Sequence, residues 1–196
     1  MHNKQPDIQQ PIHALLAERW SPRAFDIDRP IEAVKLQALL EAARWAPSCF
    51  NDQPWRFIVC NRHTDEAAWE TAAAVLADKN QLWARQAPLL MLVCSEGFFS
   101  HNGNENRWAH YDTGAAGLSI CLQATALGLF THQMGGFDLD AARTAFAIPD
   151  SVTPMAMMAV GYQGRIENLD AGFVEAEQQA RARKPVDKIV FEGRWG

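Results

Sequence analysis

The sequence lacks the short motifs that mark several large classes of enzyme. It contains no G-x-G-x-x-G, G-x-x-x-x-G-K-S/T, G-x-S-x-G or H-E-x-x-H segment. These absences exclude a P-loop and argue against a Rossmann dinucleotide site, a hydrolase nucleophile elbow and a zinc-protease helix. The six histidines are scattered along the chain, so we predict no metal ligands and no catalytic side chain. Any enzymatic chemistry is therefore expected to come from a bound cofactor.

Cysteine, long apolar runs and positive net charge are also scarce. The four cysteines form no C-x-x-C pair, and Cys60 and Cys94 lie in apolar runs where they are expected to be buried. No apolar run approaches the roughly 20 residues of a membrane span, and the N-terminus does not resemble a signal peptide. We therefore expect a reducing, cytoplasmic setting with no membrane partner. The formal net charge of −5 argues against a nucleic-acid partner.

The basic residues that are present gather in two places. Arg19, Arg23 and Arg29 lie near the N-terminus, and residues 180–196 hold five basic and only two acidic side chains. Two basic segments in an acidic protein favour a small anionic ligand, whereas solvated surface charge is the simpler interpretation of each segment alone. The length of 196 residues is that of one domain, which we predict to span 1–196.

The hydrophobic pattern predicts an α+β fold, a central mixed β-sheet flanked by helices. The residues at 89–94 are apolar at every position, which is typical of a central strand. Gly128 is expected to end a long helix. The tail after Pro185 carries a β-like segment at 188–191. Helices are predicted at 11–19, 30–46, 65–77, 107–127 and about 138–146, and strands at 55–60, 89–94, 129–134 and 155–162.

Two segments in the first third of the chain carry groups suited to a phosphorylated ligand. In Arg-Trp-Ser-Pro-Arg at 19–23, an extended backbone places both arginines and the serine on one side, as a phosphate clamp requires. In the loop at 46–57, two prolines bracket Ser48, Asn51 and Gln53, which supply both donors and acceptors. A hydrogen-bonded loop without a ligand is the alternative for the second segment.

Two later segments complete the candidate site. Gln133-Met134-Gly135-Gly136 ends a predicted strand, and paired glycines let a backbone approach a ligand closely. The alternative is an ordinary turn between strand and helix. Arg181 and Arg183 could form a second phosphate clamp or lie in a solvated terminus.

In this order, the segments resemble those of the nitroreductase superfamily over nearly the whole chain. The most specific match is Pro-Ser-x-x-Asn-x-Gln-Pro-Trp at 47–55, supported by Arg-x-Ser-x-Arg at 19–23 and Gly-Gly-Phe-Asp at 135–138. The resemblance implies a nitroreductase-like fold and an intertwined homodimer with FMN at the subunit interface. It also implies hydride transfer from NADH or NADPH, through flavin N5, to a flat nitroaromatic, quinone or enone acceptor in a ping-pong mechanism.

The same resemblance assigns roles to individual residues. Arg19 is implied to bind the FMN phosphate, Ser21 the phosphate or ribityl chain, and Arg23 the pyrimidine end of the ring. The loop at 47–53 is implied to serve the partner's flavin, and Trp83 stands where some bacterial members carry lysine. The implied FMN-binding residues are Arg19, Trp20, Ser21, Arg23, Pro47, Ser48, Asn51, Gln53, Asn80, Gln133, Met134, Gly135, Gly136, Arg181 and Arg183.

Two other functions remain open at this stage. A flavin-dependent dehalogenase or a flavin-destroying relative would keep the cofactor and change the reaction. Such members usually carry an added lid, and only the short polar loop at 95–106 is present here. A non-catalytic FMN-binding protein would keep the cofactor and carry out no reaction.

Overall fold

A computed structural model describes residues 4 and 6–195 of the chain, and it confirms the α+β class with helices around a central sheet. The ends of the predicted domain, residues 1–3 and 196, lie outside the described residues. The sheet has the strand order β1-β2-β4-β3. Its strands are β1 (Trp55–Asn61), β2 (Leu89–Glu96), β3 (Phe130–Met134) and β4 (Val152–Gly161).

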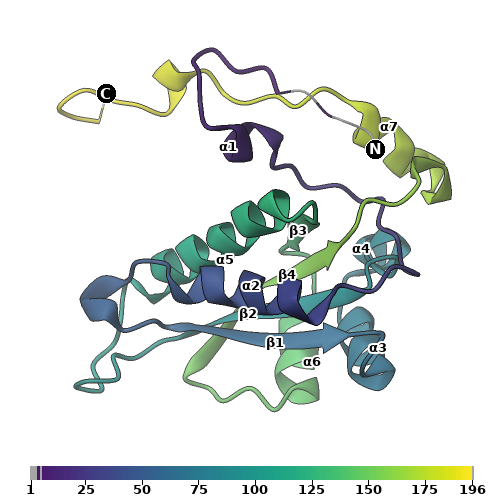
Figure 1. The fold of residues 1–196 in the computed structure, drawn as a ribbon. Helices are drawn as coiled ribbons and strands as arrows, with labels where there is room; N and C mark the ends of the chain where they lie inside the picture. The colour runs from purple at the N-terminus through teal and green to yellow at the C-terminus, as the bar shows by residue number, and fades with distance from the viewer. Residues whose placement is uncertain (1–3, 5, 196) are drawn as a thin grey trace.

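Helices cover both faces of this sheet (Figure 1). The long helices α2 (Ala33–Arg44) and α5 (Ala109–Ala126) lie on one face. The opposite face is covered by α3 (Glu66–Ala74), α4 (Asp78–Ala84) and α6 (Leu139–Ala145). The N-terminal segment with α1 (Ala14–Glu18) and the C-terminal tail run together beyond α5, outside the sheet and its helices.

Strand β2 is central, as its apolar sequence predicts, and it contributes to a hydrophobic core on each side. Leu89, Met91 and Val93 pack with α2 and α5, whereas Leu90 and Leu92 pack with α3 and α6. Successive side chains of a strand point to opposite faces, so a strand buried on both faces needs an unbroken apolar run. Cys60 and Cys94 are buried as predicted, and burial raises the pKa of each thiol to about 11.

The prediction of a mixed sheet is wrong for the described strands, because every pairing between neighbours is antiparallel. The excursion through α3 and α4 returns to the end of the sheet where it began, so Asn61 pairs with Leu89. The crossover through α5 does join two strands that run the same way, β2 and β3. Strand β4 then inserts between them and pairs antiparallel with both.

The structure also contains elements that the sequence pattern did not predict. The segment predicted as one helix at 65–77 ends at Ala74, and α4 follows as a separate helix. Helix α7 (Ala171–Gln178) lies in a stretch without an assignment. The β-like segment at 188–191 is not a strand, because within the described chain no neighbouring strand supplies its hydrogen bonds. Its side chains Ile189, Val190 and Phe191 stay exposed.

Candidate functional site

Three arginines from the two basic segments meet in one small cavity. Arg19 follows α1, and its guanidinium lies 3.4 Å from the Ser21 hydroxyl. Arg181 follows α7 and donates to the backbone carbonyls of Arg19 at 2.9 Å and Ala17 at 2.5 Å. Arg19, Arg181 and Arg183 line a cavity of about 110 Å³. The structure therefore brings Arg19 of the first predicted clamp together with Arg181 and Arg183 of the second, whereas Ser21 and Arg23 do not line the cavity.

The electrostatics of this cavity favour an anion such as phosphate, because three arginines line it against one carboxylate, that of Asp7. The Nε of Arg181 is buried and has no hydrogen-bond partner among the described residues, which is an unfavourable state for a donor. Burial lowers the pKa of Arg181, and the charges of Arg19 and Arg183 lower it further. A dianion placed among these guanidinium groups would relieve their repulsion and accept their hydrogen bonds.

Trp20 anchors this segment to the body of the protein. Its ring is buried and meets Phe130 edge-on, with 6.1 Å between ring centroids. Its side chain therefore contributes to the position of Arg19 and Ser21, which lie on either side of it in the sequence. Trp20 is not among the residues that line the cavity between the arginines.

Arg23 lies apart from the arginine cavity, beside two aromatic rings. Its guanidinium stands over the rings of Trp83 at 5.9 Å and Phe173 at 5.7 Å. Its backbone N–H donates to the two carboxylate oxygens of Glu177, at 2.9 and 3.1 Å. The sequence analysis missed Glu177 because α7 was not predicted. Trp83 is a buried core residue, and its indole ring carries no charge that could bind a ligand.

His132 on β3 links the Arg-x-Ser-x-Arg segment to the sheet. Its Nδ1 lies 2.9 Å from the Pro22 carbonyl, and its ring packs on Trp83 with 4.4 Å between centroids. Burial lowers the pKa of His132 to about 4, and the positive charge of Arg23 acts in the same direction. At neutral pH the imidazole is therefore uncharged, and its Nδ1–H donates to the carbonyl.

We expect this histidine to make the stability of the protein sensitive to acid. The pKa of His132 in the folded protein, about 4, is below the ordinary value of 6.5, so its contribution is complete above pH 6.5 and is lost as pH falls towards 4. The loss is roughly 1.4 kcal/mol for each unit between the two pKa values. Urea unfolding of wild type and His132→Gln is measured at pH 7 and at pH 4.5. Between these pH values the free energy of unfolding should fall less in the variant than in the wild type. A loss equal to that of the exposed-site control His110→Gln would contradict this assignment.

The residues predicted around the end of β3 are also close together. The side-chain amide of Asn80, on α4, donates to the Gly136 carbonyl at 2.9 Å. A Cβ at Gly136 would come within 2.7 Å of that amide, so glycine permits the contact. Gln133 is exposed and directs its amide to Cys121 at 3.4 Å, whereas Met134 is buried. Gly135 is exposed and has open space where a side chain would be.

The loop at 47–53 has a strained backbone. Phe50, Asn51 and Gln53 have φ values of 54°, 55° and 54°, although none is glycine. Each such residue costs of the order of 1–3 kcal/mol and persists only where its surroundings enforce it. The hydroxyl of Ser48 accepts from the Gln53 N–H at 3.0 Å, which closes the loop beside the exposed Pro47. Strain concentrated on predicted binding residues supports a functional role for the loop.

This loop and the backbone beside Arg23 lie near opposite ends of the sheet, as the strand register shows. Trp55, just after the loop, pairs with Ser95, which pairs with Thr153 near the start of β4. Phe25, just after Arg23, bridges Gln163 beyond the end of β4. A strand rises about 3.4 Å per residue, so roughly 30 Å separates the two places. The structure does not bring the loop to Arg23 within one chain.

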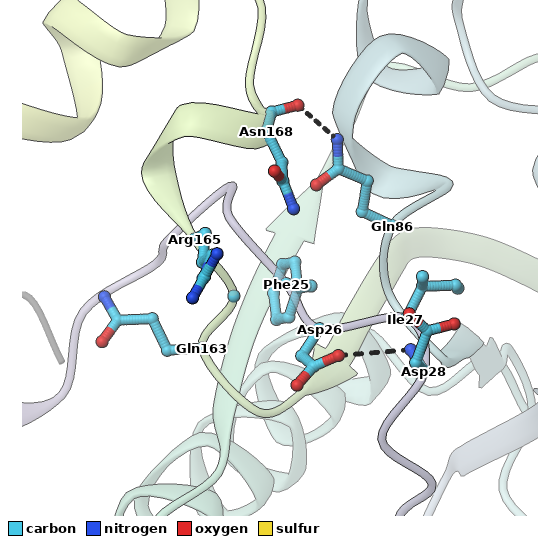
Figure 2. Close-up of a pocket in the computed structure, with 9 residues that line it drawn as sticks. Phe25, Asp26, Ile27, Asp28, Gln86, Gln163, Arg165 and Asn168 are labelled. Carbon is cyan, nitrogen blue, oxygen red and sulfur yellow. Dashed lines mark hydrogen bonds between the residues drawn. The ribbon is translucent and has the colours of Figure 1, made fainter.

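A larger cavity than the one between the arginines is lined by other residues, which Figure 2 shows. It has a volume of about 500 Å³ and lies between the segments at 25–28 and 163–168. Its walls carry Asp26, Arg165 and Asn168, and the Gln86 amide donates to the Asn168 carbonyl at 2.9 Å. The residues that line it include none of the predicted flavin contacts. Size alone therefore does not identify the functional site.

Together, the fold and the arginine cavity describe an α+β protein with a candidate site for a small anionic ligand. Comparison with known sequences is more specific, and the chain belongs to the nitroreductase family, whose model matches residues 16–162. Within the described residues, no helix is long and apolar enough to cross a membrane. No cluster of three or more potential metal ligands occurs there either.

Individual relatives agree with this assignment. A protein of Mycolicibacterium smegmatis, described only by its 15.4 kDa mass, is 35% identical over 72% of this chain and 97% of its own length. A putative NADH dehydrogenase/NAD(P)H nitroreductase of Methanothermobacter thermautotrophicus is 30% identical over 69% of each chain. A crystal structure of an oxidoreductase containing FMN is 34% identical, covers 100% of this chain and 98% of its own, and has a TM-score of 0.92.

Proposed function

We propose that this chain is a single-domain NAD(P)H-dependent FMN oxidoreductase that reduces flat electrophilic acceptors, such as nitroaromatics, quinones or enones. The observation that carries the proposal is the cavity in which Arg19, Arg181 and Arg183 converge, with a buried arginine donor left unpaired. The FMN-containing relative with the same fold, matched over the whole chain, supports the choice of ligand. The nitroreductase names of other relatives support NADH or NADPH as electron donor.

Bound FMN would supply the capacity to take up a hydride and pass it on. The protein's own part is to bind and orient the cofactor. The arginine cavity would hold the phosphate, and Arg23 would place positive charge near the pyrimidine end of the ring, where reduction adds negative charge. Gly135 leaves room for a ligand beside the backbone, whereas the space beside Gly136 holds the Asn80 amide. Donor and acceptor are proposed to use one open face in turn, which is a ping-pong mechanism.

We also propose that the protein is an intertwined homodimer with FMN at the subunit interface. The loop at 47–53 lies too far from Arg23 for both to contact one flavin within a single chain. A second copy can bring its loop to that flavin. Apolar side chains that are exposed in one chain favour such an arrangement. They are Tyr111 and Leu118 on α5, and Ile189, Val190 and Phe191 in the tail.

The proposal is tested by mixing FMN-loaded protein with NADH or NADPH in the absence of air. We expect the flavin absorbance to bleach with at least one nucleotide and to return when a nitroaromatic or quinone is added. Protein that stays yellow with both nucleotides would indicate a non-catalytic FMN-binding protein. Bleaching without turnover of those acceptors would favour a dehalogenase or flavin-destroying reaction. A flavin-loaded monomer in sedimentation would contradict the dimer.

A further inference from the structure

Arg23 is held at both ends by one face of α7. Its backbone N–H donates to both oxygens of the Glu177 carboxylate, and the next amide, that of Ala24, donates to the same group at 3.2 Å. Its guanidinium lies over the ring of Phe173. Phe173 and Glu177 are four residues apart on a helix, so their side chains lie on the same face. Helix α7 therefore fixes the main chain and the side chain of this residue together.

The burial of Glu177 is unusual for a carboxylate. The residue is only 1% exposed, and a buried charge is unfavourable unless it is paired or hydrogen-bonded. Within the described residues, Glu177 forms no ion pair within 4.0 Å, so backbone amides supply its close partners. Lys4 is a more distant cation that interacts with Glu177. Burial lowers the pKa of Lys4, and the negative charge of Glu177 partly opposes this effect.

The side chain of Arg23, whose backbone N–H binds Glu177, carries a positive charge that is available to a ligand. In the described part of the chain, the Arg23 guanidinium forms no hydrogen bond or ion pair, and its contacts are the faces of two aromatic rings. The carboxylate of Glu177 is thus used on the main chain, and the guanidinium is left available.

We propose that Glu177 is a positioning residue for Arg23 and thereby sets how strongly the site prefers reduced over oxidised FMN. This inference rests on the proposed function. Reduction adds negative charge at the pyrimidine end of the flavin, and a cation held at a fixed place stabilises that charge without reorganisation. In Glu177→Gln one carboxylate oxygen becomes an NH2 donor and the other loses its charge, so the hydrogen bonds from the Arg23 and Ala24 amides weaken and the guanidinium is held less firmly at one place.

The test compares Glu177→Gln with Glu175→Gln, a matched control on the exposed side of the same helix. Dissociation constants of oxidised and reduced FMN, linked through the midpoint potential of the bound flavin, measure the preference. We expect Glu177→Gln to reduce the preference for reduced FMN about tenfold, as loss of one charge-assisted interaction predicts. Glu175→Gln should leave it unchanged. Hydrogen exchange at the Arg23 and Ala24 amides should accelerate only in Glu177→Gln.

A double-mutant cycle separates positioning from a general loosening of the fold. In an Arg23→Ala background, Glu177→Gln should cause no further change in preference, because its effect passes through the arginine. A full tenfold change in that background, or none in the single variant, would overturn the inference. Should Glu177→Gln not fold, Phe173→Leu removes the ring beneath the guanidinium and is expected to shift the preference in the same direction. If the wild type binds no FMN, the proposed function fails as well.

Discussion

Replacement of Arg19 by alanine is expected to weaken FMN binding by about ten- to a hundredfold. Arg19 is one of three guanidinium groups around the small cavity, and hydrogen bonds to charged groups contribute about 1.5–3 kcal/mol each. A change of 1.4 kcal/mol corresponds to a factor of ten in the dissociation constant. The quenching of flavin fluorescence on titration of the apoprotein measures that constant directly.

The same titration with riboflavin shows whether the loss concerns the phosphate. Riboflavin lacks the phosphate, so Arg19→Ala should bind it as well as the wild type does. Arg62→Ala is a suitable control, because Arg62 is a surface residue that pairs with Glu66 at 3.4 Å, away from the cavity. Equal loss of FMN and riboflavin affinity would place Arg19 in the fold and not in phosphate binding. Unchanged affinity for both would remove it from the site.

The fold was predictable where a periodic pattern coincided with burial. Residues 89–94 of strand β2 are all apolar because both faces of the strand are covered, and α5 ends beside Gly128, whose φ of 71° favours glycine. The antiparallel pairing was not predictable, because no local pattern shows that β4 inserts between β2 and β3. Helix α7 has eight residues and depends on the burial of Phe173 and Glu177 for its stability, which is a tertiary effect.

The candidate site shows a similar division. The groups that would face a ligand, such as Arg19 and Gly136, were identified from sequence because their chemistry suits a phosphorylated flavin. The groups that hold them were not. Glu177 and His132 bind backbone atoms of the Arg-x-Ser-x-Arg segment from distant parts of the chain. A carboxylate that accepts from a backbone N–H leaves no sequence motif, and neither does an imidazole that donates to a backbone carbonyl. The role of such a residue becomes visible only in three dimensions.

Asp112 binds a backbone N–H of the loop at 47–53, as Glu177 binds backbone N–H groups of the segment at 23–24. It lies in the first turn of α5, is only 5% exposed, and accepts from the Cys49 N–H at 2.9 Å. The loop that begins there contains three non-glycine residues with positive φ. A strained loop needs such an anchor, because its own backbone favours other conformations. The partial positive charge at the start of a helix also stabilises a carboxylate at this place.

Asp112→Ala is therefore expected to destabilise the protein by about 1–3 kcal/mol, because the hydrogen bond from the Cys49 N–H to the carboxylate is lost. For a chain of this size, each kcal/mol lowers the melting temperature by roughly 2–4 °C. Asp112→Asn keeps an oxygen that can accept the hydrogen bond, so its loss should be clearly smaller. His110→Ala, an exposed change in the same turn, is the control for the helix itself.

The same variant also tests whether the loop at 47–53 serves the flavin of a second copy. If it does, Asp112→Ala should lower the FMN content of the purified dimer together with its melting temperature, and excess FMN should restore part of both by mass action. If the loop has no part in binding, the melting temperature should fall while the FMN dissociation constant of the folded protein stays at its wild-type value. A melting temperature equal to that of His110→Ala would show that the Asp112 carboxylate does not hold the loop.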